Sequence, residues 1–90
     1  MESLRRRVIV TGRVQGVWYR DRCRSEALTR GVAGWVHNRS DGSVEAVFEG
    51  SPQAVGQMVS WCRVGPPRAR VDHVEVIPEA VAGEAGFVVR

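Results

Sequence analysis

The sequence predicts a small α+β domain in which one antiparallel four-stranded sheet carries two helices on one face. Short segments rich in β-branched residues, such as residues 8–11, are typical of strands. Two other segments repeat apolar residues every three to four positions, as helices do when they bury one face. Their order along the chain, β-α-β-β-α-β, is that of the ferredoxin-like sandwich.

The first strand is expected over residues 6–14, with Gly12 and Gly16 bracketing a tight turn at its end. A helix follows over residues 19–30, and Gly31 ends it because glycine readily adopts the left-handed conformation found at helix ends. The apolar stripe of this helix combines residues at four-residue spacing with one neighbour: Tyr19, Cys23, Ala27 and Leu28.

Residues 32–38 and 43–49 predict two further strands joined by a hairpin turn at 39–42. Asp-Gly within that turn is a strong hairpin signal. The later strand alternates between apolar residues for one face (Val44, Ala46, Phe48) and acidic residues for the other (Glu45, Glu49).

The second helix is expected to begin at Ser51 and Pro52, an N-cap followed by the residue favoured in the first helical turn. Its buried face repeats apolar residues at helical spacing: Val55, Met58, Val59 and Cys62. A fourth strand is expected over residues 70–77, and residues 87–89 could add a short fifth strand. We expect residues 1–90 to form a single domain, because the length suits one domain.

Composition and charge exclude several classes of protein. The net charge is +3, but the arginines are spread along the chain among acidic residues, without the basic stripe of a nucleic-acid-binding protein. No apolar run approaches the roughly 18 residues of a membrane span, and the run after residues 5–7 is too short for a signal peptide. We therefore expect a cytoplasmic protein that binds neither nucleic acid nor membrane, and a chain of this size is expected to be a monomer.

The cysteines and histidines show no metal-binding pattern. Cys23 and Cys62 are far apart in the sequence, and in a reducing cytosol we expect free thiols that pack as small hydrophobes. The sequence does not decide whether these cysteines instead form a disulfide between the two helices. His37 and His73 have no ligand partner at a recognisable spacing, so we expect no metal site.

The turn after the first strand has the features of an anion cradle. Its glycines allow successive backbone N–H groups to point at one spot, and the helix start adds unpaired N–H groups and a positive dipole end. Arg20 adds a planar guanidinium that suits phosphate oxygens. Such turns also occur in proteins that bind nothing, so the pattern alone leaves both interpretations open.

Asn38 ends the second predicted strand. A right-handed crossover would make the first two strands parallel and bring their C-terminal ends to the same edge of the sheet. With one strand between them, these ends lie about 10 Å apart. Asparagine before a hairpin commonly serves only as a turn-former. Beside an anion cradle, however, its amide oxygen could accept a hydrogen bond from a water and hold it in line with phosphorus.

Two stretches resemble the signatures of the acylphosphatase family. Residues 10–20 resemble the first signature, G-x-V-Q-G-V-x-aromatic-R, and residues 34–44, closed by Gly50, resemble the second, G-aromatic-V-x-N-x-x-x-G-x-V. The likeness covers about residues 7–90. Two positions depart from the pattern: Tyr19 stands where Phe is more common, and His37 stands where Lys, Arg or Gln is usual. The side chain of His37 should face away from that of Asn38, since strand residues alternate.

The resemblance implies an enzyme that hydrolyses the carboxyl–phosphate anhydride bond of small-molecule acyl phosphates without a metal or cofactor. Arg20 would bind the phosphate oxygens and Asn38 would position the attacking water. The backbone that would cradle the phosphate belongs to Gln15, Gly16, Val17, Trp18, Tyr19 and Arg20. We also expect Trp18 and Trp35 to line the entrance. The sequence does not identify the natural acyl phosphate or the group that accepts the proton of the water.

The alternative from another class is a non-catalytic anion-binding or regulatory adaptor domain that keeps the cradle. The resemblance allows it because larger carbamoyl-transferring maturation proteins carry a domain of this kind. Turnover of benzoyl phosphate without added metal would distinguish the enzyme from the adaptor.

Overall fold

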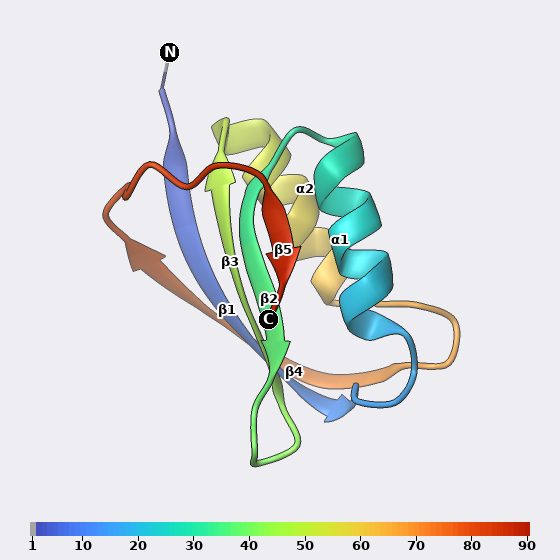
Figure 1. Ribbon diagram of the computed structural model, residues 1–90. Helices are drawn as coiled ribbons and strands as arrows, with labels where there is room; N and C mark the ends of the chain where they lie inside the picture. The colour runs from blue at the N-terminus through green and yellow to red at the C-terminus, as the bar shows by residue number, and fades with distance from the viewer. Residues whose placement is uncertain (1) are drawn as a thin grey trace.

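A computed structural model describes residues 2–90 of the chain. The elements in chain order are β1 (Leu4–Arg13), α1 (Tyr19–Thr29), β2 (Ala33–Asn38), β3 (Val44–Gly50), α2 (Pro52–Cys62), β4 (Arg70–Glu79) and β5 (Phe87–Val89). One sheet holds the strands in the order β4-β1-β3-β2-β5, with both helices against the same face (Figure 1). This confirms the predicted α+β, ferredoxin-like architecture.

The sheet has five strands rather than four. The pairs β1–β3, β1–β4 and β2–β3 are antiparallel, as predicted, but the short strand β5 runs parallel to β2 and makes the sheet mixed. Its register places Phe87 beside Gly34 and Val89 beside Val36. The C-terminal segment therefore extends the sheet beyond β2 and covers what would otherwise be an open edge of that strand.

The first two strands lie parallel on either side of β3. Val44 of β3 pairs with Val10 of β1 on one side and with Asn38 of β2 on the other. Val10 therefore lies about 10 Å, or two strand spacings, from Asn38, and β1 continues beyond it to Arg13, where the loop begins. This confirms the prediction that β1 and β2 are parallel and that their C-terminal ends lie at the same edge of the sheet.

The helices bury narrow apolar stripes against the inner face of the sheet. Tyr19, Cys23 and Ala27 of α1 are buried, as predicted, but Leu28 is 49% exposed and does not join them. Because Leu28 lies about 100° around the helix from Ala27, the close packing of a narrow stripe turns it outward. In α2, the predicted face of Val55, Met58 and Cys62 is buried, with Val59 partly buried against the same core. The Ser51 hydroxyl caps α2 by accepting a hydrogen bond from the Ala54 N–H at 3.2 Å.

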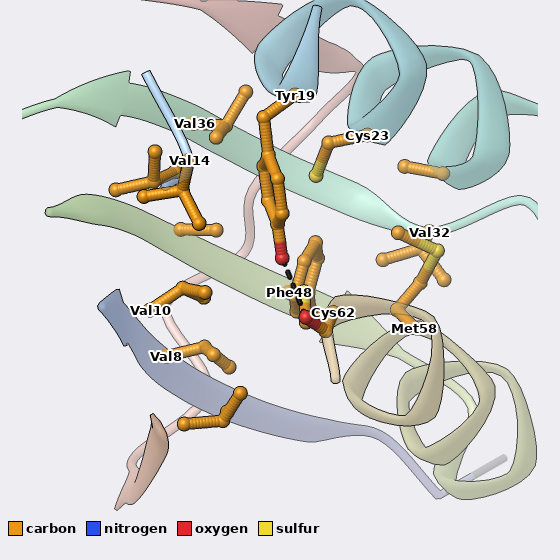
Figure 2. Close-up of a cluster of buried hydrophobic side chains, with 14 of the residues drawn as sticks. Val8, Val10, Val14, Tyr19, Cys23, Val32, Val36, Phe48, Met58 and Cys62 are labelled. Atoms are coloured by element: carbon orange, nitrogen blue, oxygen red, sulfur yellow. Dashed lines mark hydrogen bonds between the residues drawn. The ribbon is translucent and has the colours of Figure 1, made fainter. Parts of the chain in front are cut away.

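Tyr19 fastens the start of α1 to the end of α2 (Figure 2). Its buried hydroxyl donates a hydrogen bond to the carbonyl oxygen of Cys62 at 2.8 Å, and its ring lies 5.2 Å from that of Trp61. The residue four positions after Cys62 is Pro66, which has no N–H, so this helix-terminal carbonyl lacks its usual helical partner. The hydroxyl that distinguishes Tyr19 from the expected Phe supplies the missing donor.

The thiols of Cys23 and Cys62 are free and buried between the helices and the sheet. Hydrogen bonding to Cys62 and burial raise the pKa of Cys23 well above its ordinary value. A thiol with a raised pKa holds little thiolate at neutral pH, which makes Cys23 a packing residue rather than a nucleophile.

The loop before β5 covers the part of the outer face of the sheet around Glu49, which the alternation in β3 did not predict. Glu49 faces away from Phe48 as expected, yet it is only 6% exposed. Its carboxylate accepts hydrogen bonds from the N–H groups of Ala82 (2.9 Å), Gly83 (2.8 Å) and Glu84 (2.8 Å). Arg5 pairs with it at 3.1 Å. Glu49 therefore holds the loop that leads into β5, and these hydrogen bonds lower its pKa.

Replacing Glu49 with Gln should destabilise the protein by about 2 kcal/mol at neutral pH, because the amide cannot accept all these N–H groups and Arg5 loses one of its three carboxylate partners. The folded-state pKa lies below the ordinary 4.5. The carboxylate therefore contributes stability above that pH and loses it as the pH falls. Urea denaturation at a series of pH values should show the difference between wild type and variant shrinking below about pH 4.5.

The matched control for this series is Glu75→Gln, which neutralises an exposed carboxylate on β4. This control should change the free energy of unfolding by less than about 0.5 kcal/mol. Equal effects of the two substitutions at neutral pH would contradict the role given to Glu49.

Replacing Tyr19 with Phe should lower the free energy of unfolding by about 1 kcal/mol, because the buried Cys62 carbonyl loses its donor. The ring remains to fill the core, so the variant should fold. The midpoint of urea denaturation measures the effect, and an unchanged midpoint would show that the hydroxyl contributes nothing to stability.

Candidate functional site

A hollow of about 370 Å³ opens at the edge of the sheet where β1 and β2 end. The loop after β1 and the first turn of α1 form one side of it, and Asn38 and the C-terminal strand form the other. Its lining residues are Val14, Gly16, Trp18, Tyr19, Arg20, Asp21, Asn38 and Val89. The hollow therefore brings together both residues to which the sequence assigned chemistry, Arg20 and Asn38.

Backbone geometry shapes the loop on the β1 side. Gly12 has φ 127° where β1 bends beside β4, and a Cβ there would lie 2.2 Å from the carbonyl oxygen of Arg70. Gly16 has φ 73° and Trp18 has φ 68°, whereas φ at Val17 is not positive. Backbones that alternate between the two hands turn successive N–H groups toward one point, which forms an anion-binding concavity.

Trp18 is the only non-glycine residue among 2–90 with a positive φ. A left-handed backbone costs such a residue about 1–2 kcal/mol. It is also the N-cap of α1 and makes no side-chain capping bond, while its side chain is 69% exposed. Strain of this kind concentrates at functional sites, where the surrounding structure holds it in place.

The start of α1 supplies backbone donors and a cation. The first helical hydrogen bond runs from the Arg22 N–H to the Trp18 carbonyl, so the N–H groups of residues 19–21 have no helical acceptor. Arg20 is half-buried, and no carboxylate among residues 2–90 lies within 4.0 Å of its guanidinium nitrogens. By contrast, Arg5 and Arg7 on the sheet are held by glutamates. The guanidinium of Arg20 is thus available to an anion.

Asn38 lines the same hollow from the end of β2. Its side-chain oxygen, Oδ1, is buried and has no hydrogen-bond partner within residues 2–90. A buried acceptor without a donor costs free energy unless a ligand or water supplies one. His37 lies on the opposite face, where its Nε2 is 2.7 Å from Glu45 Oε1, as the alternation of the strand predicts.

Gln15 and Val17 do not line the hollow. The Gln15 side chain turns to the β2–β3 hairpin, where Nε2 donates to the carbonyl oxygens of Arg39 (2.8 Å) and Ser43 (2.9 Å). Gln15 therefore ties the loop to the turn that follows Asn38. The side chain of Val17 is buried and lines a neighbouring groove.

Trp35 lies outside the hollow, so the expectation that it lines the entrance was wrong. It is on the outer face of the sheet, and the guanidinium carbons of Arg7 and Arg90 lie 5.4 Å and 4.4 Å from the centre of its ring. Val36, its neighbour in β2, occupies the inner face instead. Trp18 does line the hollow, as expected.

Val14, Asp21 and Val89 also line the hollow, although the sequence did not predict this. Val14 and Asp21 flank the predicted loop, and their closeness to Arg20 along the sequence could have identified them as lining residues. Val89 reaches the hollow only because β5 runs parallel to β2, and no local pattern reveals that pairing.

Among residues 2–90, no three acidic, cysteine or histidine side chains gather closely enough to hold a metal ion. Within the same residues, neither helix has the length and apolar character needed to cross a membrane.

The chain is similar in sequence and in structure to proteins of one known family. A family model described as Acylphosphatase matches residues 6–89. The acylphosphatase of Rubrobacter xylanophilus is 56% identical over 100% of this chain and 86% of its own length. Among solved structures, the acylphosphatase of Bacillus subtilis is 39% identical, with a TM-score of 0.93 and coverage of 97% and 98% of the two chains. That of Coxiella burnetii is 35% identical, with a TM-score of 0.94 and coverage of 98% and 93%.

These matches run almost end to end, and they include the loop after β1 and the β2–β3 hairpin that form the hollow. The chain therefore belongs to the acylphosphatase family, the hydrolases that split acyl phosphates into a carboxylate and inorganic phosphate.

Proposed function

We propose that this hydrolysis takes place in the hollow between the β1–α1 loop and Asn38. The loop backbone and Arg20 bind the phosphoryl group, and Asn38 orients the attacking water. One observation carries the assignment: Asn38, whose Oδ1 has no hydrogen-bond partner within residues 2–90, lines the same hollow as Arg20, whose guanidinium has no carboxylate partner within those residues. A water would supply the missing donor to Asn38, and a phosphate would supply the missing anion to Arg20.

The phosphoryl group binds where the positive ends of several dipoles meet. The alternating backbone of residues 16–19 and the free N–H groups at the start of α1 donate to its oxygens. The Arg20 guanidinium adds a full charge and two parallel donors. These groups are positioned before the substrate arrives, so they stabilise the charge that moves onto the phosphoryl oxygens without reorganising.

Water attacks from the Asn38 side. Oδ1 accepts a hydrogen bond from one O–H of the water, which leaves a lone pair on the water oxygen directed at phosphorus. As the new P–O bond forms, the bond from phosphorus to the acyl oxygen breaks, and its electron pair leaves on the carboxylate. The proton of the water departs with the phosphate or with the carboxylate.

The leaving group explains why so few side chains suffice. A carboxylate is a weak base, with a conjugate-acid pKa of about 4.3 in a simple carboxylic acid, so it departs without being protonated. The site therefore needs no general acid. Positioning and charge stabilisation, which Asn38, Arg20 and the backbone amides supply, are the main contributions that phosphoryl transfer requires.

We further propose that residues 1–90 act as one monomeric domain in the cytoplasm, without a metal, cofactor or nucleic-acid partner. A single buried cluster joins the sheet and both helices, which supports one domain. The free thiols of Cys23 and Cys62 suit a reducing compartment. Several arginines of the sheet are paired with glutamates instead of forming a basic stripe.

Replacing Arg20 with Gln should lower kcat/KM for benzoyl phosphate by about 10² to 10³, because one preorganised charge is lost from the transition state. A spectrophotometric assay in the presence of a chelator measures the rate. Arg63→Gln is the matched control, since Arg63 is exposed and lines neither the hollow nor the neighbouring groove. Comparable activity of the two variants would remove Arg20 from the mechanism.

Replacing Asn38 with Ala should lower kcat by about 10² or more, while inhibition by inorganic phosphate stays within about threefold of wild type, because water positioning is lost and the cradle is kept. Asn38→Asp keeps the shape but adds a negative charge, and should weaken phosphate inhibition as well. A wild-type protein that binds phosphate but turns over no benzoyl phosphate would favour the non-catalytic adaptor.

A further inference from the structure

We propose that the groove beside the phosphate hollow binds the acyl part of the substrate, and that Arg22 and Arg68 there select acyl phosphates carrying a second negative charge. This inference rests on the proposed function, because the hollow must hold the phosphoryl end. It names the substrate class that the phosphate cradle leaves undefined: small, flat or apolar acyl groups with an anionic group at the far end.

The groove adjoins the hollow. It has a volume of about 380 Å³ and runs between the start of α1 and the loop after α2. The two spaces share Trp18 and Asp21 as lining residues. An acyl group whose phosphoryl end lies in the hollow can therefore extend past Trp18 into the groove.

The groove has an apolar surface of rigid side chains. The indole of Trp18 is 69% exposed, on a backbone held at φ 68°. Pro66 and Pro67 line the groove from the loop after α2, and Val17 adds a further apolar side chain. An exposed indole gains free energy when a flat acyl group covers it, and rigid partners lose little conformational entropy on binding.

Positive charge dominates the rim. Arg22 and Arg68 are exposed, and no carboxylate among residues 2–90 lies within 4.0 Å of either guanidinium. Asp21 is the acidic residue that lines the groove, so two cations face one anion. With Arg20 committed to the phosphoryl group, Arg22 and Arg68 remain for a second carboxylate or phosphate.

The two walls of the groove are fixed relative to each other. The Tyr19 hydroxyl bonds to the carbonyl of Cys62, which joins the first turn of α1 to the end of α2. The Ala69 N–H donates to the Pro66 carbonyl at 2.9 Å and closes the loop that carries Arg68. Figure 1 shows this loop beside the one that leads into α1. A preformed groove avoids the entropic cost of ordering these loops around the substrate.

The test compares two non-hydrolysable analogues, benzoylphosphonate and 4-carboxybenzoylphosphonate, which differ only in a carboxylate across the ring. Titration calorimetry on the full chain should show the carboxylated analogue binding about three- to fivefold more tightly, the range expected of exposed ion pairs. Arg68→Gln combined with Arg22→Gln should abolish this preference and leave the affinity for benzoylphosphonate within about twofold. The control Arg63→Gln removes the same charge from a site outside the groove and should keep the preference.

A second arm tests the indole. Trp18→Asn retains a residue that tolerates the left-handed backbone but removes the ring. It should weaken the binding of benzoylphosphonate about tenfold more than the binding of acetylphosphonate, because the two analogues share the phosphonate and differ in the group that covers the indole.

Equal affinity of wild type for the two benzoyl analogues, or a preference that survives loss of both arginines, would overturn the inference. Turnover of benzoyl phosphate is measured separately and tests only the proposed function. If the protein hydrolyses benzoyl phosphate but shows no preference between the analogues, the proposed function stands and the role of the groove is wrong. If it shows the preference but no turnover, the role of the groove stands and the catalytic assignment is wrong.

Discussion

The geometry of the site depends on the position of β3 between β1 and β2. Val44 pairs with Val10 on one side and Asn38 on the other, so the loop after β1 opens opposite the Asn38 amide. A slip of one residue in either ladder would turn the buried face of a strand outward, which makes this register costly to change. α1 then begins directly after the loop and carries Arg20 into the same hollow.

Strain and unmet hydrogen bonds concentrate in this hollow, while the other buried side-chain polar atoms of residues 2–90 have hydrogen-bond partners. Trp18 has a left-handed backbone, and within residues 2–90 Asn38 Oδ1 lacks a donor and Arg20 lacks a carboxylate partner. On the other side of the sheet, the buried carboxylate of Glu49 accepts three backbone hydrogen bonds and forms an ion pair with Arg5. The stable parts of the fold thus hold the site in a conformation that its own residues would not maintain alone.

The C-terminal segment links the outer face of the sheet to the site. Glu49 holds the loop before β5, and β5 pairs with β2 so that Val89 forms a wall of the hollow. From the helix side, the Arg24 Nε donates to the carbonyl oxygen of Phe87 at 3.3 Å. A segment distant in sequence from the phosphate loop therefore shapes the space beside it.

The sequence by itself determined the order of the elements and the glycine-bracketed loop, and its resemblance to the acylphosphatase family singled out Arg20 and Asn38. The elements and the loop follow from residues that are close along the chain: periodicity for strands and helices, and turn chemistry for the loop. Tertiary structure alone decided that Val89 joins the hollow, that Trp35 lies on the outer face, and that Leu28 turns outward. The physical reason is that these placements depend on which strands lie side by side and how a helix is rotated against the sheet, and packing between distant segments sets both.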